Sequence, residues 1–277
     1  MSLTKSILHK VVNLIPLRLR TKIKKLPLLA PLQRALLNRF MKNDSFVYKI
    51  NAGPAAGLVF NVTLPEDKNI WTGTYEFDFS TVLAKEISKD NVCYDIGGFK
   101  GFMSGIMAVN GASEVYAFEP LKENYEKIQM LIKLNPTLKI SVFEYAIGSN
   151  DGQINFDISE DPSMNKIENS LFHNETGVKE KRNVQIFKLD SLINEKGFKP
   201  PDVIKIDVEG AEYEVIKGAH NSLKQFKPKL LIEVHGYNIG KMILPELNKY
   251  GYNIICTETN KLPDFVSEPS VCHYICK

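Results

Sequence analysis

Four short stretches of the sequence carry residues that could bind a ligand or move a proton. The first is a glycine-rich turn, Asp95-Ile96-Gly97-Gly98-Phe99-Lys100-Gly101, which follows a strand-like run and precedes a helical run. Glycines at such a turn let the backbone approach a ligand that a Cβ atom would repel, and the following helix N-terminus favours an anionic group. The turn alone is a weak signal, because many nucleotide-binding turns share it and some such turns bind nothing.

The second stretch is Phe118-Glu119-Pro120, at the end of the next strand-like run. An acid at the tip of the second strand of a doubly wound sheet can accept hydrogen bonds from both ribose hydroxyls of an adenosine. Glu119 lies 18 residues after Gly101, about where a ribose-binding acid is expected. The spacing of Gly97, Gly98 and Gly101 is not G-x-G-x-x-G, which argues against NAD.

The third and fourth stretches, residues 205–212 and 231–236, place acids and a histidine after two further strand-like runs. In open α/β sheets ligands bind outside the carboxyl ends of the strands, so we expect Asp207, Glu209 and His235 to face one crevice. An acid here could instead cap the following helix. We favour capping for Glu212 and a functional role for Asp207, which sits at the strand tip.

The elements that must position these residues alternate between strand and helix, which predicts βαβ units and a mostly parallel sheet. The strand-like runs cover residues 92–96, 114–118, 140–145, 203–206, 230–234, 252–256 and 271–276. The predicted fold class is therefore α/β, a doubly wound, mostly parallel seven-stranded sheet. Before it, residues 46–62 read as a small β-hairpin, and Gly73-Thr74 is expected to open a helix. The polar insertion 151–186 is expected to form a lid or substrate wall.

The N-terminal segment differs from the rest in charge. Residues 1–42 carry ten Lys and Arg residues and no acid, whereas the remainder carries 25 bases against 32 acids. We divide the chain into a basic helical extension, residues 1–45, and one domain, residues 46–277. Within the extension, residues 3–15 and 32–40 have helical periodicity. The arm is expected to pack on the domain, with contact to an anionic membrane as the alternative.

Composition narrows the setting further. No apolar run reaches the roughly 18 residues needed to span a bilayer, and the start does not read as a secretory signal, so we expect a cytoplasmic protein. The four cysteines suit reduced thiols. Cys272 and Cys276, with His273 between them, could suggest a zinc site. No second pair of ligands accompanies this cysteine pair, so a buried terminal strand is the better interpretation.

Taken together, these motifs resemble the FkbM family of S-adenosylmethionine-dependent methyltransferases. The resemblance runs from about Phe46 to the C-terminus and includes Gly73-Thr74-Tyr75-Glu76, the glycine turn, Glu119-Pro120, Ala146-Ile147-Gly148, Leu189-Asp190-Ser191-Leu192 and, most specifically, residues 205–212. It implies a class I, Rossmann-like fold with S-adenosylmethionine as cofactor. The residues expected to contact the cofactor are Asp95, Gly97, Gly98, Phe99, Gly101, Glu119 and Ala146. The family turn usually reads Asp-x-Gly-Ala-Asn-x-Gly, so Phe99 stands where an asparagine is usual.

The resemblance also implies methyl transfer to a hydroxyl group, typically of a sugar in a glycan, a lipid-linked saccharide or a natural product. A hydroxyl needs a general base, and His235 has a suitable intrinsic pKa. Asp207 is the competing base or the group that orients it, and Glu209 completes the predicted catalytic set. We expect no metal, although Asp207, Glu209, Glu233 and His235 could together hold a divalent ion.

Two other functions stay open. One is RNA methylation, prompted by the basic arm, but the arm lacks interleaved aromatic residues and the domain is acidic, which makes nucleic acid an unlikely partner. The other is a binding module that keeps the fold but has lost turnover, at which Phe99 hints. The sequence does not indicate an oligomeric state.

Overall fold

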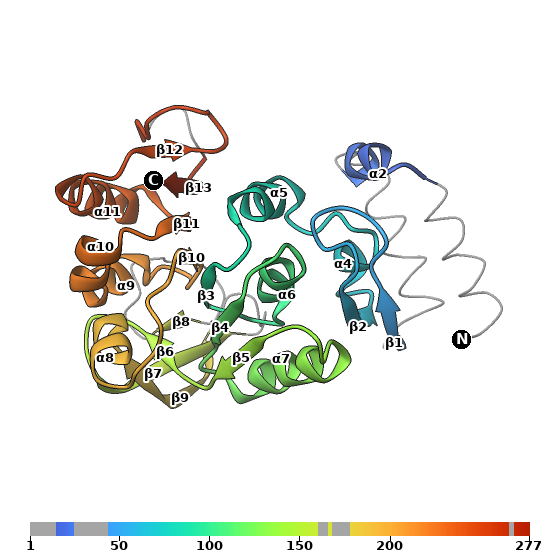
Figure 1. Ribbon diagram of the computed structural model, residues 1–277, viewed down its shortest axis with the longest axis horizontal. Coiled ribbons are helices and arrows are strands. Elements are labelled where there is room, and N and C mark those ends of the chain that lie inside the picture. The colour runs from blue at the N-terminus through green and yellow to red at the C-terminus, as the bar shows by residue number, and fades with distance from the viewer. Residues whose placement is uncertain (1–14, 25–43, 160–165, 168–177, 266–268) are drawn as a thin grey trace.

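The computed structural model describes residues 15–24, 44–159, 166–167, 178–265 and 269–277 (Figure 1). The described helices are α2 (Leu17–Lys24), α4 (Lys68–Trp71), α5 (Phe77–Glu86), α6 (Phe102–Val109), α7 (Lys122–Leu134), α8 (Leu189–Asn194), α9 (Glu212–Gly218), α10 (His220–Phe226) and α11 (Tyr237–Lys249). The described strands are β1 (Asp44–Lys49), β2 (Val59–Leu64), β3 (Val92–Ile96), β4 (Glu114–Phe118), β5 (Ile140–Phe143), β6 (Ala146–Ile147), β7 (Gly152–Ser159), β8 (Lys166–Ile167), β9 (Val178–Phe187), β10 (Val203–Ile206), β11 (Lys229–His235), β12 (Ile254–Cys256) and β13 (Val271–Cys276).

A seven-stranded sheet forms the centre of the described chain, in the order β12-β13-β11-β10-β3-β4-β5. Neighbouring strands from β11 to β5 pair in parallel, whereas β13 is antiparallel to both β11 and β12. The sheet confirms the predicted fold class, and each predicted strand-like run forms one of its strands. The sequence reveals these strands well because parallel strands are covered on both faces and therefore read as nearly continuous apolar runs.

Helices cover both faces of this sheet (Figure 1). Side chains alternate along each strand, so Cys93 and Val115 point into one core, with α5 and α6, while Tyr94 and Ile204 point into another. The second core is completed by α8, α9, α10 and α11. The hairpin of β1 and β2 is antiparallel, as predicted, and packs on the first core. The helix expected from Gly73-Thr74 begins later, at Phe77.

The 151–186 insertion contains strands that the sequence analysis did not predict. β7 and β9 pair in an antiparallel ladder and, with β6 and β8, form a separate four-stranded sheet in the order β6-β9-β7-β8. Residues 153–158 alternate polar and apolar side chains, the period of a half-buried strand, and this signal was overlooked. Phe156 on β7 lines the cavity described below. That the insertion forms a lid or substrate wall stays a prediction.

Part of the basic arm is seen to contact the domain. α2, for which no helix was predicted, starts directly after Pro16, and Arg20 donates a hydrogen bond to the carbonyl oxygen of Thr72 at 3.2 Å. The side chain of Leu17 lies against Gly53 and Gly73. The helices predicted over 3–15 and 32–40 fall outside the described residues.

The described helices and the four cysteines can be compared with the expectations about membrane spans and zinc. Within the described ranges, no helix combines the length and apolar character that crossing a membrane requires. All four cysteines are buried and unbridged, and Cys272 and Cys276 lie in β13, which fits the interpretation of a buried terminal strand.

Candidate active site

A cavity of about 950 Å³ opens at the carboxyl ends of β3, β4 and β10. This is the edge at which the four chemistry-bearing stretches were expected to meet. The predicted site residues that line the cavity are Gly97, Gly98, Phe99, Glu119, Ala146, Asp207 and Glu209. Asp95, Gly101 and His235 were also predicted, but they lie behind the lining and are nearly or fully buried.

The glycine turn is held by the sheet itself. The backbone N–H groups of Gly97 and Gly98 both donate to the carbonyl oxygen of Phe118, each at 3.0 Å. A Cβ atom on Gly97 would lie 1.8 Å from the carbonyl oxygen of Asp207, and its φ is +83°. The glycine is therefore required by a close approach of two backbones within the protein, which brings the turn after β3 against the turn after β10.

Phe99 has a left-handed backbone conformation, which bulky residues such as phenylalanine rarely adopt. Its φ of +49° lies in the left-handed region, where asparagine is several times more common than bulky residues. Asparagine is also the usual residue at this position of the glycine turn in the family that the sequence resembles. The Phe99 ring lies 5.4 Å from the ammonium group of Lys100 and 6.0 Å from that of Lys127, within the range of cation–π attraction.

Glu119 presents a buried carboxyl group to the cavity. Its Oε2 accepts a hydrogen bond from the Phe99 N–H at 2.8 Å, and its Oε1 accepts from the Leu121 N–H at 3.0 Å and from Asn124 at 3.3 Å. Burial raises the pKa of Glu119 to about 7, although these hydrogen bonds oppose the rise. The carboxyl group thus braces the glycine turn and retains lone pairs for a ligand hydroxyl.

Asp95 acts through neighbours rather than on the cavity. One carboxylate oxygen accepts a hydrogen bond from the Ser104 hydroxyl at 2.5 Å, and the other lies 3.2 Å from the ammonium group of Lys205. Lys205 is itself buried, donates to the carbonyl oxygen of Gly97 at 2.8 Å and pairs with Asp207 at 3.3 Å. Lys205 therefore ties the glycine turn to the acidic side of the cavity.

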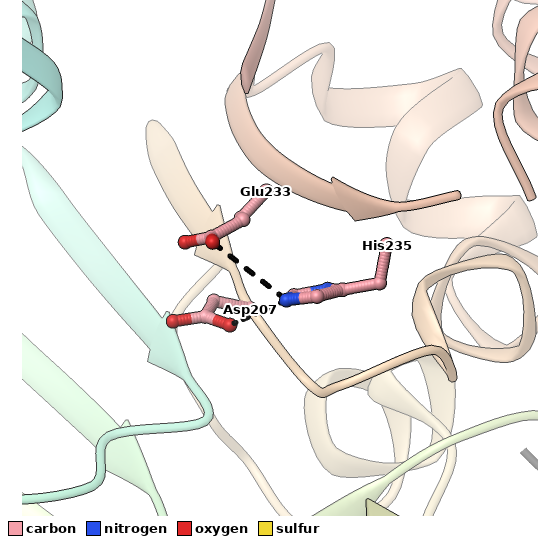
Figure 2. Close-up of side chains that lie close together, drawn as sticks. All are labelled: Asp207, Glu233 and His235. Atoms are coloured by element: carbon pink, nitrogen blue, oxygen red, sulfur yellow. Dashed lines mark ion pairs between the residues drawn. The ribbon is translucent and has the colours of Figure 1, made fainter. Parts of the chain in front are cut away.

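Figure 2 shows Glu233, Asp207 and His235 converging at the ends of β10 and β11. The Nε2 atom of His235 lies 3.3 Å from a carboxylate oxygen of Glu209, 3.6 Å from Glu233 and 4.0 Å from Asp207. Its other ring nitrogen, Nδ1, lies 2.8 Å from Oε1 of Glu212. The imidazole is thus enclosed by four carboxyl groups.

This enclosure changes the order in which the groups lose their protons as the pH rises. Burial alone would lower the pKa of His235, but the hydrogen bond to Glu212 and the charges of Glu212, Glu209 and Asp207 raise it to about 9. Burial raises the pKa of Glu209 to about 8, and the charge of Asp207 adds to the rise, which His235 opposes. A group with a pKa near the working pH is best suited to general base catalysis, so the arrangement favours a carboxylate over the imidazole.

Several site residues were missed by the sequence analysis. His273 on β13 lies opposite Glu233 in the sheet register, 3.5 Å from its carboxylate, and pairs with Glu258 at 2.6 Å. Glu76 lines the cavity, and burial together with the charges of Asp207 and Glu233 raises its pKa to about 7. His273 had been noted only beside Cys272 and Cys276 as a weak sign of zinc, whereas Glu76 lay within a stretch already singled out by resemblance.

The acidic side of the cavity could receive either a proton or a metal ion. One ligand atom from each of Asp207, Glu233 and His235 lies within 4.8 Å of the others, so a divalent ion is the alternative that the sequence left open. We favour a protonated imidazole, because its positive charge already sits among these carboxylates at hydrogen-bonding or ion-pairing distances.

Comparison with known proteins identifies a family. The Methyltransferase FkbM domain matches residues 95–254, more than half of the 277-residue chain. A curated relative, the hexuronic acid methyltransferase AglP of Haloferax volcanii, is 26% identical over 191 residues, which are 69% of this chain and 75% of the relative.

Solved structures with a similar chain path include two methyltransferases. The methyltransferase FkbM of Methylobacillus flagellatus KT is 21% identical with a TM-score of 0.45, over 67% of this chain and 43% of that chain. The precorrin-6y C5,15-methyltransferase of Geobacter metallireducens GS-15 is 14% identical with a TM-score of 0.42, over 73% of this chain and 86% of that chain. The match therefore spans less than half of the Methylobacillus protein.

Proposed function

The chain belongs to the FkbM methyltransferase family, and we propose that it transfers a methyl group from S-adenosylmethionine to a hydroxyl group of a saccharide. The observation that carries the proposal is the meeting of two kinds of group in one cavity. Glu119 and the glycine turn suit an adenosine with an attached amino acid, while Asp207 and Glu209 line the same cavity and offer carboxyl groups to an acceptor hydroxyl.

The residues present fit this cofactor. A buried carboxyl at the tip of β4 suits the two ribose hydroxyls, and Ala146 adds a small side chain to the cavity lining. When bound, S-adenosylmethionine supplies a methyl group on a positively charged sulfur, which is already activated for transfer. The work left to the protein is to align the acceptor oxygen and to remove its proton.

We assign the removal of the proton to Glu209. Bound S-adenosylmethionine would supply the methyl group, and the Glu209 carboxylate would accept the proton that the acceptor hydroxyl gives up on methylation. His235, which the sequence favoured as the base, would remain protonated behind Glu209 and Asp207 and hold them in place. Asp207, paired with Lys205, would orient the acceptor hydroxyl.

A saccharide is the favoured acceptor because the curated relative named above acts on a hexuronic acid. Peripheral contact of the basic arm, residues 1–42, with an anionic membrane remains part of the proposal. It would bring the enzyme to a lipid-linked acceptor.

The proposal is tested with the purified full chain and methyl-labelled S-adenosylmethionine. Acceptors are a hexuronic acid glycoside, a neutral hexoside, a lipid-linked saccharide and an RNA pool. We expect label in a saccharide fraction and its loss in Glu209→Gln. Label in RNA alone would overturn the acceptor class, and cofactor binding without transfer to any of them would point to an inactive binding module.

A further inference from the structure

Glu212 is fully buried, although it stands at the first position of helix α9, where a capping side chain is normally exposed. Its Oε1 accepts a hydrogen bond from the Gly210 N–H at 2.9 Å and a second from Nδ1 of His235 at 2.8 Å. Its Oε2 has no hydrogen-bond partner among the residues that the structure describes. Capping alone does not require a buried charge, because short polar side chains cap helices at exposed ends. A buried carboxylate that has lost its hydration needs a compensating cation, and His235 lies in hydrogen-bonding contact with it.

The contact decides how the His235 ring is oriented. Because Nδ1 donates to Glu212, Nε2 is left facing Glu209 at 3.3 Å and Asp207 at 4.0 Å. We propose that Glu212 is a positioning residue, which holds His235 in this orientation and through it fixes the two carboxyl groups that meet the acceptor hydroxyl. The proposal rests on the proposed function, in which Glu209 takes the proton.

The charge of Glu212 matters as well as its shape. The groups that face His235 are Glu212 from α9, Asp207 and Glu209 from the turn after β10, and Glu233 from β11. Burial lowers the pKa of His235, and the Glu212 hydrogen bond is the largest influence that raises it again. Without the Glu212 charge, His235 therefore loses its proton at a lower pH.

Glu212→Gln separates charge from shape. Since a single oxygen accepts both hydrogen bonds, the glutamine carbonyl can keep both while the charge is lost. We expect kcat at pH 8.5 to fall by about tenfold to a hundredfold, with the KM for S-adenosylmethionine unchanged. The alkaline decline of kcat moves down by about one to two pH units, the range that corresponds to one charge-assisted hydrogen bond. Glu214→Gln, which removes the same charge from the exposed side of α9, serves as the matched control and retains the wild-type profile.

A double-mutant cycle completes the test. If Glu212 acts through His235, Glu212→Gln added to His235→Asn lowers kcat no further than His235→Asn alone. Additive losses, or a Glu212→Gln profile identical to wild type, would overturn the proposal. If the glutamine variant does not fold, Glu212→Asp keeps the charge but withdraws the oxygen. Because the hydrogen bond to His235 is then lost, kcat should fall and its alkaline decline should move to lower pH. A wild-type kcat and profile would overturn the positioning role.

The failure of the proposed function can be told apart from the failure of this inference. If the wild type methylates no saccharide, the proposed function falls, but the titration of His235 by nitrogen-15 NMR still tests its contact with Glu212. We expect the Nε2 resonance of His235 to titrate at a lower pH in Glu212→Gln than in the wild type. An unchanged titration would overturn the inference by itself.

Discussion

Binding of S-adenosylmethionine should be linked to a proton through Glu119. The pKa of this carboxyl is raised to about 7 by burial, so it is mostly protonated at pH 6 and mostly ionised at pH 8. Ribose hydroxyls donate to the ionised form, and below pH 7 binding must first remove the proton. Affinity should therefore be constant above pH 8 and fall by up to about tenfold per pH unit below pH 7.

The magnitude for Glu119→Gln follows from the contacts. At pH 8 the variant lacks the charge that strengthens the two ribose hydrogen bonds, a loss of roughly 1.5–3 kcal/mol, or about tenfold to 150-fold in Kd. The glutamine also has only one side-chain oxygen where Glu119 has two. Its NH₂ group therefore faces either the Phe99 N–H or the pair of donors from Leu121 and Asn124, and those donors lose their acceptor. A thermal melt must therefore accompany the binding measurement.

Isothermal titration calorimetry at pH 6, 7 and 8, in two buffers of different ionisation enthalpy, measures both affinity and proton release. Titration of the cofactor's own amino group is common to wild type and variant, so the difference between them isolates Glu119. Glu126→Gln, on the exposed face of the following helix α7, is the control and should bind as wild type. Equal affinities at pH 8, or equal pH slopes in wild type and Glu119→Gln, would refute the ribose assignment.

Four further outcomes are expected. Glu209→Gln should lower kcat by roughly 10²–10⁴ with cofactor affinity intact. In a pH–rate profile of the wild type, kcat should rise as Glu209 loses its proton near pH 8 and fall as His235 loses its proton near pH 9. Gly97→Ala should lower the free energy of unfolding in urea by roughly 2–4 kcal/mol, because the new Cβ atom would clash with the backbone of Asp207. Gly57 also has a positive φ but has open space around it, so the loss in Gly97→Ala beyond that in Gly57→Ala measures the clash. Treatment with a chelator should leave the methylation rate unchanged. If the rate is lost and Mg²⁺ or Mn²⁺ restores it, a metal ion rather than the protonated His235 is the positive charge among the carboxylates. Removal of residues 1–42 should make the protein insoluble and leave vesicle binding unchanged if the arm packs on the domain, as we expect; under the membrane alternative, anionic vesicles bind the full chain in a salt-sensitive way and the truncation abolishes that binding yet keeps cofactor affinity.

The sequence predicted the central sheet well and the side-chain partners less well. Strands such as β3 and β10 are buried on both faces, so their apolar runs are visible without knowledge of the fold. Strand β7 is half exposed and its signal was diluted by polar residues. The expectation that Asp207, Glu209 and His235 face one crevice followed from a general rule about strand ends, and the structure places Asp207 and Glu209 in the cavity lining but His235 behind it.

What could not be predicted depends on register and on side chains meeting across the chain. Nothing in residues 271–276 indicates that His273 lies opposite Glu233, because that follows from the antiparallel pairing of β13 with β11. The capping interpretation of Glu212 was wrong, because α9 has no side-chain cap hydrogen bond and the Gly210 N–H that Glu212 accepts lies before the helix. Helix periodicity does not reveal the contact of Glu212 with His235. Asp95 was placed at the right strand end, yet its carboxylate turns inward to Ser104.

The position of β13 also constrains how the molecule can be assembled during synthesis. This strand lies between β11 and β12, both of which leave the ribosome before it, so the sheet has a gap until residues 271–276 arrive. The same strand carries His273, whose imidazole pairs with Glu233. A nascent chain can therefore complete its glycine turn and the ends of β3 and β4 long before the acidic side of the cavity gains its last counter-charge. Among the described strands, β13 is therefore the one whose insertion completes the charge balance around Glu233.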